Sequence, residues 1–249
     1  QVCVPYTSEE NSSMIQQVKA EAQEMSRYWT GALPEPIPML PEVVTPEMVE
    51  AQVDRSERNH QVLLGLTREM VEVAAFTLDK AISLVSDNVR SVTQFYKVLA
   101  YQLNQYTTPV QVVIVDPLGL VPLDQFKEAH RFSDTLSAKE GMNIILDNLK
   151  ERMTQPGEYT QSLIIIPDIQ ILGQSLNITE NQLEGPKYGI TPVFVGNYKD
   201  LMTNYSTLVT LHRQLATQVF MGMRISDQEY VRFPYISNEK SPRPNEGYI

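Results

Sequence analysis

The eight residues Ser86–Thr93, SDNVRSVT, lie where a phosphate-binding loop would be expected, because they follow an apolar β-branched run and precede apolar residues at helical spacing. Such a loop holds phosphates with convergent backbone N–H groups, a lysine and a hydroxyl that meets the metal. In this stretch Ser86 and Val89 take the first and middle glycine positions, and Val92 takes the lysine position. Only Thr93 matches, so the stretch predicts a poor phosphate site.

The surrounding sequence points the same way. No glycine lies between Gly65 and Gly119, and Asp87 adds negative charge where a triphosphate would lie. The simpler alternative is an ordinary strand-to-helix turn that never bound a nucleotide. The positions of the candidate loop are Ser86, Asp87, Asn88, Val89, Arg90, Ser91, Val92 and Thr93.

Two aspartates each follow a buried apolar run. Asp116 ends VQVVIVD, and Asp168 ends SLIIIPD directly after Pro167. In a parallel sheet both carboxylates emerge at the carboxyl edge, where ligands bind. This placement suits metal or water chemistry, but without a phosphate-binding lysine nearby the favoured interpretation is that each aspartate caps the next helix or turn.

Other catalytic patterns are missing from the sequence. The histidines His60, His130 and His212 have no carboxylate or cysteine at a metal-ligand interval, so no metal site is predicted. No G-x-S-x-G elbow is present. The single cysteine, Cys3, cannot form an internal disulfide, which favours a reducing compartment.

The bulk properties argue against binding to nucleic acid and against a membrane-spanning helix in this chain. A net charge of −10 opposes broad binding to nucleic acid phosphates, because that binding needs cationic side chains. The apolar runs are far shorter than the roughly 20 residues of a membrane-spanning helix. Because the first residue is Gln rather than Met, we expect the chain to be a part of a longer protein.

The second and larger part of the chain alternates short apolar strands with helical stretches, which predicts an α/β fold with a mainly parallel sheet and helices on both faces. The predicted strands are Ile82–Ser86, Val110–Asp116, Leu163–Asp168, Thr191–Gly196 and Gln218–Arg224. The predicted helices are Val89–Gln105, Ala138–Met153 and Tyr205–Ala216.

The first part of the chain differs from the rest. VCVPY predicts a short strand, and the following stretch to Trp29 predicts an amphipathic helix capped by Ser8. Five prolines then follow between Leu33 and Pro46, where the fixed φ of proline predicts an extended tether. We therefore place a domain boundary at its end, with residues 1–45 as one part and residues 46–249 as the other.

Several segments, in their order, resemble the last module of the FtsK/SpoIIIE-type coupling ATPases of type VII secretion. YWTGALPEPIPMLPEVVT resembles the linker of that family, and LLGLTREMVEVAAFTLDKAISLVS resembles the start of the module. SLIIIPDI stands where the family has its second acidic motif, with Pro167 in place of the first acid and Asp168 kept. EGPKYGITPVFVGNYKDL and the final GMRISDQEYVRFPYISNEKSPRPNEGYI resemble the sensor-strand region and the ending.

The resemblance implies a P-loop NTPase-like (RecA/FtsK-like) fold with a degenerate nucleotide site. It implies that residues 1–45 are the end of a preceding ATPase module plus a linker, and that residues 46–249 are a terminal module that has lost its catalytic residues. Neither ATP nor Mg²⁺ is then expected as a cofactor. The expected location is the cytoplasmic face of the cell membrane, as part of a membrane-anchored protein.

The resemblance also implies partners. The terminal module of related ATPases recognises the carboxyl-terminal signal of WXG-type substrates, so we expect binding of secreted proteins or their signal peptides, coupling to the upstream ATPase modules and a homo-oligomer in the full-length protein. No motif marks the peptide-binding residues. Two alternatives stay open: residual nucleotide binding or turnover with Thr93, Asp168 and Arg90, and a purely structural assembly module whose tether docks Ile37, Met39 and Leu40 into an apolar pocket.

Overall fold

The computed structural model describes residues 11–31, 38–54, 58, 61–122, 124–155, 157–169, 180–233 and 239–249. Its contacts divide the chain into two units, residues 1–39 and 40–249. The first contains helix α1 (Asn11–Tyr28), as the sequence predicts. The predicted strand VCVPY, the cap Ser8 and Ile37 lie outside the described residues. The division into a preceding module and a terminal module stays a prediction.

The second unit is built on a seven-stranded sheet with the order β5-β4-β6-β7-β3-β8-β9. All neighbouring strands are parallel except the last pair, β8 and β9. The strands are β3 (Ile82–Val85), β4 (Gln111–Val115), β5 (His130–Phe132), β6 (Ser162–Ile166), β7 (Ile190–Gly196), β8 (Thr217–Met221) and β9 (Gly247–Tyr248). The predicted α/β fold with a mainly parallel sheet is confirmed.

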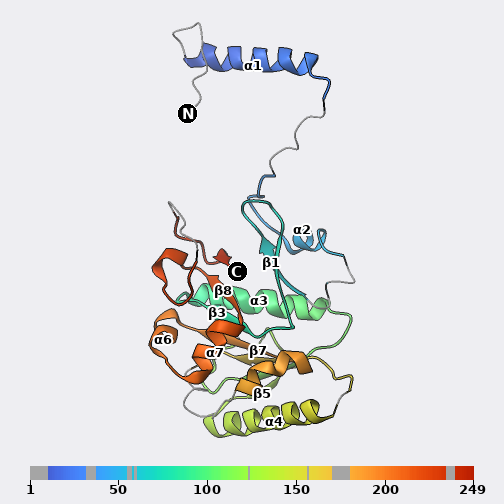
Figure 1. The fold of residues 1–249 in the computed structure, drawn as a ribbon, viewed down its shortest axis with the longest axis vertical. Helices are drawn as coiled ribbons and strands as arrows, with labels where there is room; N and C mark the ends of the chain where they lie inside the picture. The colour runs from blue at the N-terminus through green and yellow to red at the C-terminus, as the bar shows by residue number, and fades with distance from the viewer. Residues whose placement is uncertain are drawn as a thin grey trace. The chain divides into compact units, whose positions relative to one another are not determined.

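Helices cover both faces of this sheet (Figure 1). On one face α3 (Val89–Gln105) packs with the hairpin of β1 (Gln61–Leu66) and β2 (Val73–Thr77). On the other face lie α4 (Thr135–Thr154), α6 (Tyr198–Thr203) and α7 (Thr207–Leu215). The shorter helical segments are α2 (Pro46–Glu50), η2 (Glu180–Tyr188) and η3 (Ile225–Asp227).

The apolar runs of the sequence explain the two cores. Every residue of β6 is buried, with Leu163 and Ile165 in the core under α3 and Ile164 and Ile166 in the core under α4. Successive strand residues point to opposite faces, so a strand covered on both sides is apolar along nearly its whole length. The exception in β6 is Ser162, whose hydroxyl accepts from Arg152 Nη2 and donates to Thr160 O.

The largest differences from the predicted elements are at the edges of the sheet. The three-residue β5 and the two-residue β9 were not predicted, because such short strands carry too few residues for an alternating pattern. The strands of the β1–β2 hairpin were not predicted either. The predicted strand Gln218–Arg224 is too long, since β8 ends at Met221 and Gly222 turns the chain at φ +65°.

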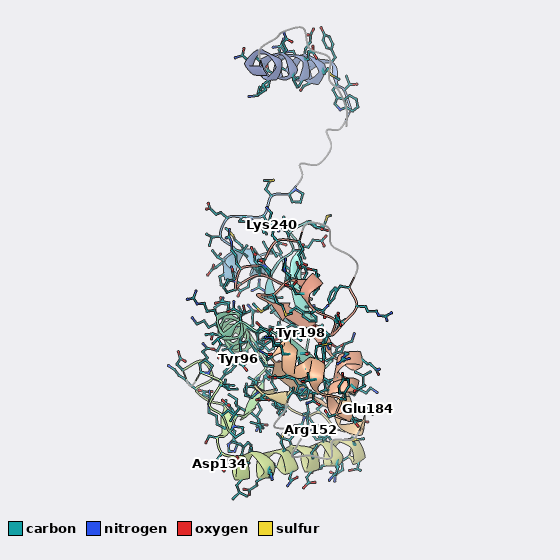
Figure 2. All side chains as sticks on the ribbon, turned by 90° about the vertical axis from the view of Figure 1, so that its left-hand side faces the viewer. Tyr96, Asp134, Arg152, Glu184, Tyr198 and Lys240 are labelled. Atoms are coloured by element: carbon teal, nitrogen blue, oxygen red, sulfur yellow. The ribbon has the colours of Figure 1, made fainter. Side chains whose placement is uncertain are left out.

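A glycine allows helix α4 to pack close to the edge strand β5. A Cβ added to Gly141 would lie 2.4 Å from the ring of Phe132, which is below any normal contact distance. Asp134 caps the amino end of this helix, and Figure 2 shows it at one end with Arg152 near the other.

We therefore predict that Gly141→Ala lowers the free energy of unfolding by about 1–3 kcal/mol, because the methyl group overpacks the Phe132 contact. Alanine at an ordinary helical position would instead add about 1 kcal/mol. The matched control is Gly65→Ala, where an added Cβ meets nothing within 4 Å. Urea unfolding measures both; a gain in stability for Gly141→Ala would contradict the close packing.

Candidate functional site

The candidate phosphate loop is a short turn from the end of β3 to the start of α3. The Ser86 backbone N–H donates to Gly196 O of β7 at 3.1 Å. The Ser86 hydroxyl donates to Met221 O of β8 at 2.7 Å and accepts from Asn88 N at 3.1 Å. Both strands that flank β3 are therefore bonded to the first residue of the turn.

The first amides of α3 are bonded within the turn. Asn88 is the N-cap of α3, and its Oδ1 accepts from Arg90 N at 2.9 Å and from Ser91 N at 3.4 Å. Helix N-terminal amides are the donors that bind phosphate in nucleotide loops. With Asn88 N bonded to Ser86 Oγ, three amides of this turn donate to side-chain oxygens of the turn itself.

The other loop positions offer a phosphate little. Asp87 is exposed, and its Oδ1 accepts from Tyr198 N at the start of α6 at 2.8 Å, so an anionic group lies beside the turn. The Thr93 hydroxyl, which would meet the metal, donates to Val89 O at 2.9 Å. Arg90 is exposed to solvent.

The turn after β8 closes the loop from the side. A Cβ on Gly222 would come within 2.1 Å of Ser91 Oγ, so the Gly222 backbone lies against the start of α3. Ser91 itself is fully buried. Gly222, which allows this approach, lies in the turn after β8 and is far from the loop in the sequence.

The two aspartates at the carboxyl edge lie in different surroundings. Asp116 is buried, with Oδ1 accepting from Leu120 N at 2.9 Å and Oδ2 from Val121 N at 2.8 Å, so the capping interpretation is confirmed there. Asp168 is half-buried after the buried Pro167. Strand β7 separates β6, which precedes Asp168, from β3 and the loop.

The histidines are dispersed in the fold. His60 lies outside the described residues, His130 is exposed on β5, and His212 is fully buried against Phe194 with a ring-centroid distance of 4.2 Å. No group of three or more His, Cys, Asp or Glu that could hold a metal occurs among the residues described. In the same part of the chain, no helix is long and apolar enough to cross a membrane.

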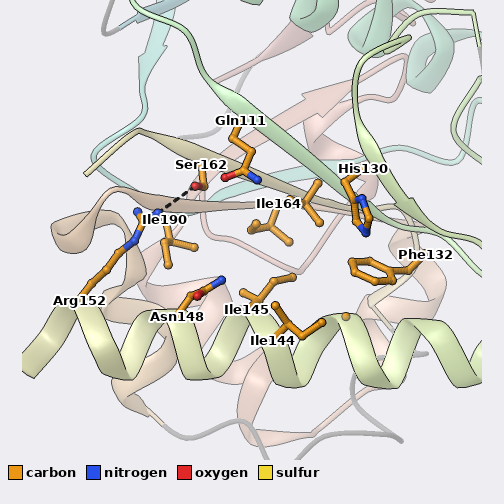
Figure 3. A pocket seen from close by; sticks show the side chains of 12 residues that line it. Gln111, His130, Phe132, Ile144, Ile145, Asn148, Arg152, Ser162, Ile164 and Ile190 are labelled. Carbon is orange, nitrogen blue, oxygen red and sulfur yellow. Dashed lines mark hydrogen bonds between the residues drawn. The ribbon is translucent and has the colours of Figure 1, made fainter. Parts of the chain in front are cut away.

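A pocket of about 240 Å³ lies between α4 and the sheet (Figure 3). Gln111, Ser162 and Ile190, the first residues of β4, β6 and β7, form part of its wall. The pocket therefore reaches the amino ends of these strands, and it extends along the sheet to Phe132, which pairs with Val115 at the carboxyl end of β4. No residue of the candidate loop Ser86–Thr93 lines it. Sequence patterns did not mark this pocket.

Helix α4 contributes a stripe of residues to the pocket. Ile144, Asn148 and Arg152 follow one another at intervals of four, so they share one face of the helix. Figure 3 shows them along the helix, with His130 and Phe132 near the Ile144 end. The sequence signal for the pocket is this spacing, which places the polar side chains of Asn148 and Arg152 in line with the aliphatic Ile144 on one face of the helix.

Arg152 is held rigidly at the other end of the pocket. Its Nη1 donates to Tyr188 O and Gly189 O, both at 3.1 Å, and its Nη2 donates to Ser162 Oγ at 3.3 Å. Its guanidinium also stacks 4.9 Å from the centre of the Tyr159 ring. Burial lowers the pKa of Arg152 from its ordinary value, but an arginine stays charged at neutral pH.

Comparison with known proteins finds relatives that align with nearly the whole chain. No family model matches. The chain is 24% identical over 252 residues to the type VII secretion system protein EssC of Staphylococcus aureus (strain NCTC 8325 / PS 47), an alignment that covers 98% of this chain and 17% of EssC. The chain thus spans about a sixth of the length of the curated relatives that it matches.

Among solved structures, the cytoplasmic domain of EssC matches all of this chain and 53% of its own, with a TM-score of 0.67 and 16% identity. The chain is similar to the carboxyl-terminal ATPase module of EssC. The resemblance to type VII secretion ATPases that the motifs indicated is confirmed, as is the P-loop NTPase-like fold.

A second solved structure concerns a peptide complex. ATPases 2 and 3 of EccC from Thermomonospora curvata, in complex with a signal sequence peptide, match 97% of this chain and 47% of their own, with a TM-score of 0.60 and 12% identity. At these identities the EssC and EccC structures establish the shared fold and leave the site residues to be argued from this chain alone.

The buried His212 predicts a pH dependence of stability. Burial lowers its pKa to about 3, whereas an unfolded chain restores about 6.5. Between these values the unfolded state binds the extra proton, so the free energy of unfolding falls as the pH drops below about 6.5, by up to ~1.4 kcal/mol per unit.

Urea unfolding between pH 7 and pH 4 measures this effect. The His212→Leu variant should show a shallower decline than the wild type, while His130→Gln, altered at an exposed position, should keep the wild-type slope. Equal slopes for all three proteins would show that His212 does not titrate in this way.

Proposed function

We propose that this chain is a non-catalytic module of a type VII secretion motor that recognises secreted substrates and couples their binding to the upstream ATPase modules of the same protein. The similarity to EssC along 98% of the chain supports the role in the motor. The proposed partners are WXG-type secreted proteins or their signal peptides, and the proposed location is the cytoplasmic face of the cell membrane.

One observation carries the loss of catalysis: amides of the candidate loop donate to oxygens of the loop itself. A triphosphate would have to displace Asn88 Oδ1 from Arg90 N and Ser91 N. It would gain no lysine in return, since Val92 takes that position, and Asp87 would repel it.

Substrate recognition is supported by two further features. The fold matches EccC ATPases 2 and 3, whose solved structure is a complex with a signal sequence peptide. The pocket under α4 combines apolar walls with a few polar groups, which is typical of sites that bind ligands through both shape and hydrogen bonds. No residue of the candidate loop lines the pocket.

Calorimetry with millimolar Mg-ATP tests the loss of nucleotide binding. We expect no saturable heat for the 249-residue chain and no change for Thr93→Ala, because the Thr93 hydroxyl is bonded to Val89 O. A saturable signal that Thr93→Ala removes would overturn the proposal. It would favour the alternative of a residual ATPase with Thr93, Asp168 and Arg90, for which Mg-dependent turnover lost in Asp168→Asn is the decisive result.

Substrate recognition is tested by a pull-down with the same chain. A WXG-type secreted protein of the same bacterium should be retained, whereas a version lacking its carboxyl-terminal signal should not. A different result would favour the structural assembly role. In that case the chain retains neither version of the secreted protein, while deletion of this module from the full-length protein abolishes assembly of the secretion complex.

A further inference from the structure

The pocket under α4 carries an inference about what it binds. Its walls are apolar at one end, where Phe132, Ile144 and Ile145 meet, and cationic at the other, where the guanidinium of Arg152 lies. Asn148 lies between them on α4. The arrangement presents a hydrophobic surface, a carboxamide and a positive charge in that order along one helix.

The positive charge has no acidic counterpart in the pocket. None of the residues that line it is aspartate or glutamate. The acceptors of Arg152 within the described part of the chain are backbone carbonyls and the Ser162 hydroxyl, which satisfy donors without carrying a negative charge. The charge of Glu151 also acts on Arg152, but Glu151 is exposed and lies outside the pocket lining. A guanidinium in such a setting favours an anionic oxygen over a neutral one.

The apolar end is open to solvent. Ile144 is a large aliphatic residue, yet 49% of its surface is exposed although it lines the pocket. Removing it from water on binding is favourable, in proportion to the area covered. A volume of about 240 Å³ suits a side chain or two rather than a folded domain.

We propose that this pocket receives an apolar side chain of the substrate's peptide and that a carboxylate of the same peptide binds Arg152. This inference rests on the proposed function and assigns its binding site. A cavity of about 240 Å³ admits one or two side chains, which favours a peptide over a second folded copy of this chain. The site lies on the face of the sheet under α4 and contains no residue of the candidate phosphate loop.

The isoleucines provide a site-resolved readout. Ile144, Ile145, Ile164 and Ile190 line the pocket, whereas Ile82, Ile114 and Ile165 belong to the core on the opposite face of the sheet. The 249-residue chain, labelled at isoleucine δ1 methyl groups, is titrated with a synthetic peptide of the carboxyl-terminal signal of a WXG-type secreted protein. The pocket methyl signals should shift and the opposite-face signals should stay.

Two variants on one helix test the apolar end. Ile144→Arg should weaken peptide binding by about tenfold or more, because it places a charge at the apolar end of the pocket. Leu136→Arg makes the same change at a residue of α4 that is 77% exposed and outside the pocket lining, so it should bind as the wild type does.

The charged end is tested on the peptide, because Arg152 also connects α4 to β6 and η2 and its replacement risks unfolding. Replacing the acidic residues of the peptide with their amides should weaken binding, and added salt should weaken the acidic peptide more than the amide version. Equal affinity for both peptides would overturn the role of Arg152.

The outcomes separate the two proposals. If the peptide binds but the pocket methyl signals do not move and Ile144→Arg binds normally, the pocket assignment is wrong and substrate recognition stands. If the wild-type chain binds neither the peptide nor the secreted protein, both fall.

Discussion

At the turn after β3, the side-chain oxygens of Ser86 and Asn88 accept from the backbone amides of Asn88, Arg90 and Ser91. Each such bond satisfies a donor that would otherwise need water or an anion, since the first turn of a helix leaves its N–H groups without intrahelical partners. The donors at the start of α3 are thereby satisfied within the turn itself.

The same bonds connect the turn to the rest of the sheet. Ser86 binds Met221 of β8 through its hydroxyl and Gly196 of β7 through its amide. Gly222 then lies against Ser91, so the space beside the helix start is filled by backbone. The loop, the end of β8 and the turn that follows β8 are therefore packed against one another.

The region between α4 and the sheet is packed differently from this turn. There α4 is held near β5 by the contact of Gly141 with Phe132, and it is connected to β6 and η2 by Arg152. A pocket persists between these two fixed points, with apolar walls and a cation that no lining carboxylate neutralises. The amides of the turn after β3 are thus bonded within the turn, while the cavity lies on the face of the sheet that α4 covers.

The sequence determined the central strands, because β6 and β7 are buried on both faces and such strands consist almost entirely of apolar residues, as in the LIII run of β6. It also determined the bounds of α3, where Asn88 caps an amphipathic run, and the poor match of Ser86–Thr93 to a phosphate loop. Tertiary structure alone decided the edge strands β5 and β9, the approach of Gly222 to Ser91, and the pocket. Each of these depends on residues far apart in the chain, such as Arg152 and Gly189 or Gly222 and Ser91, whose proximity follows from strand order rather than from any local pattern.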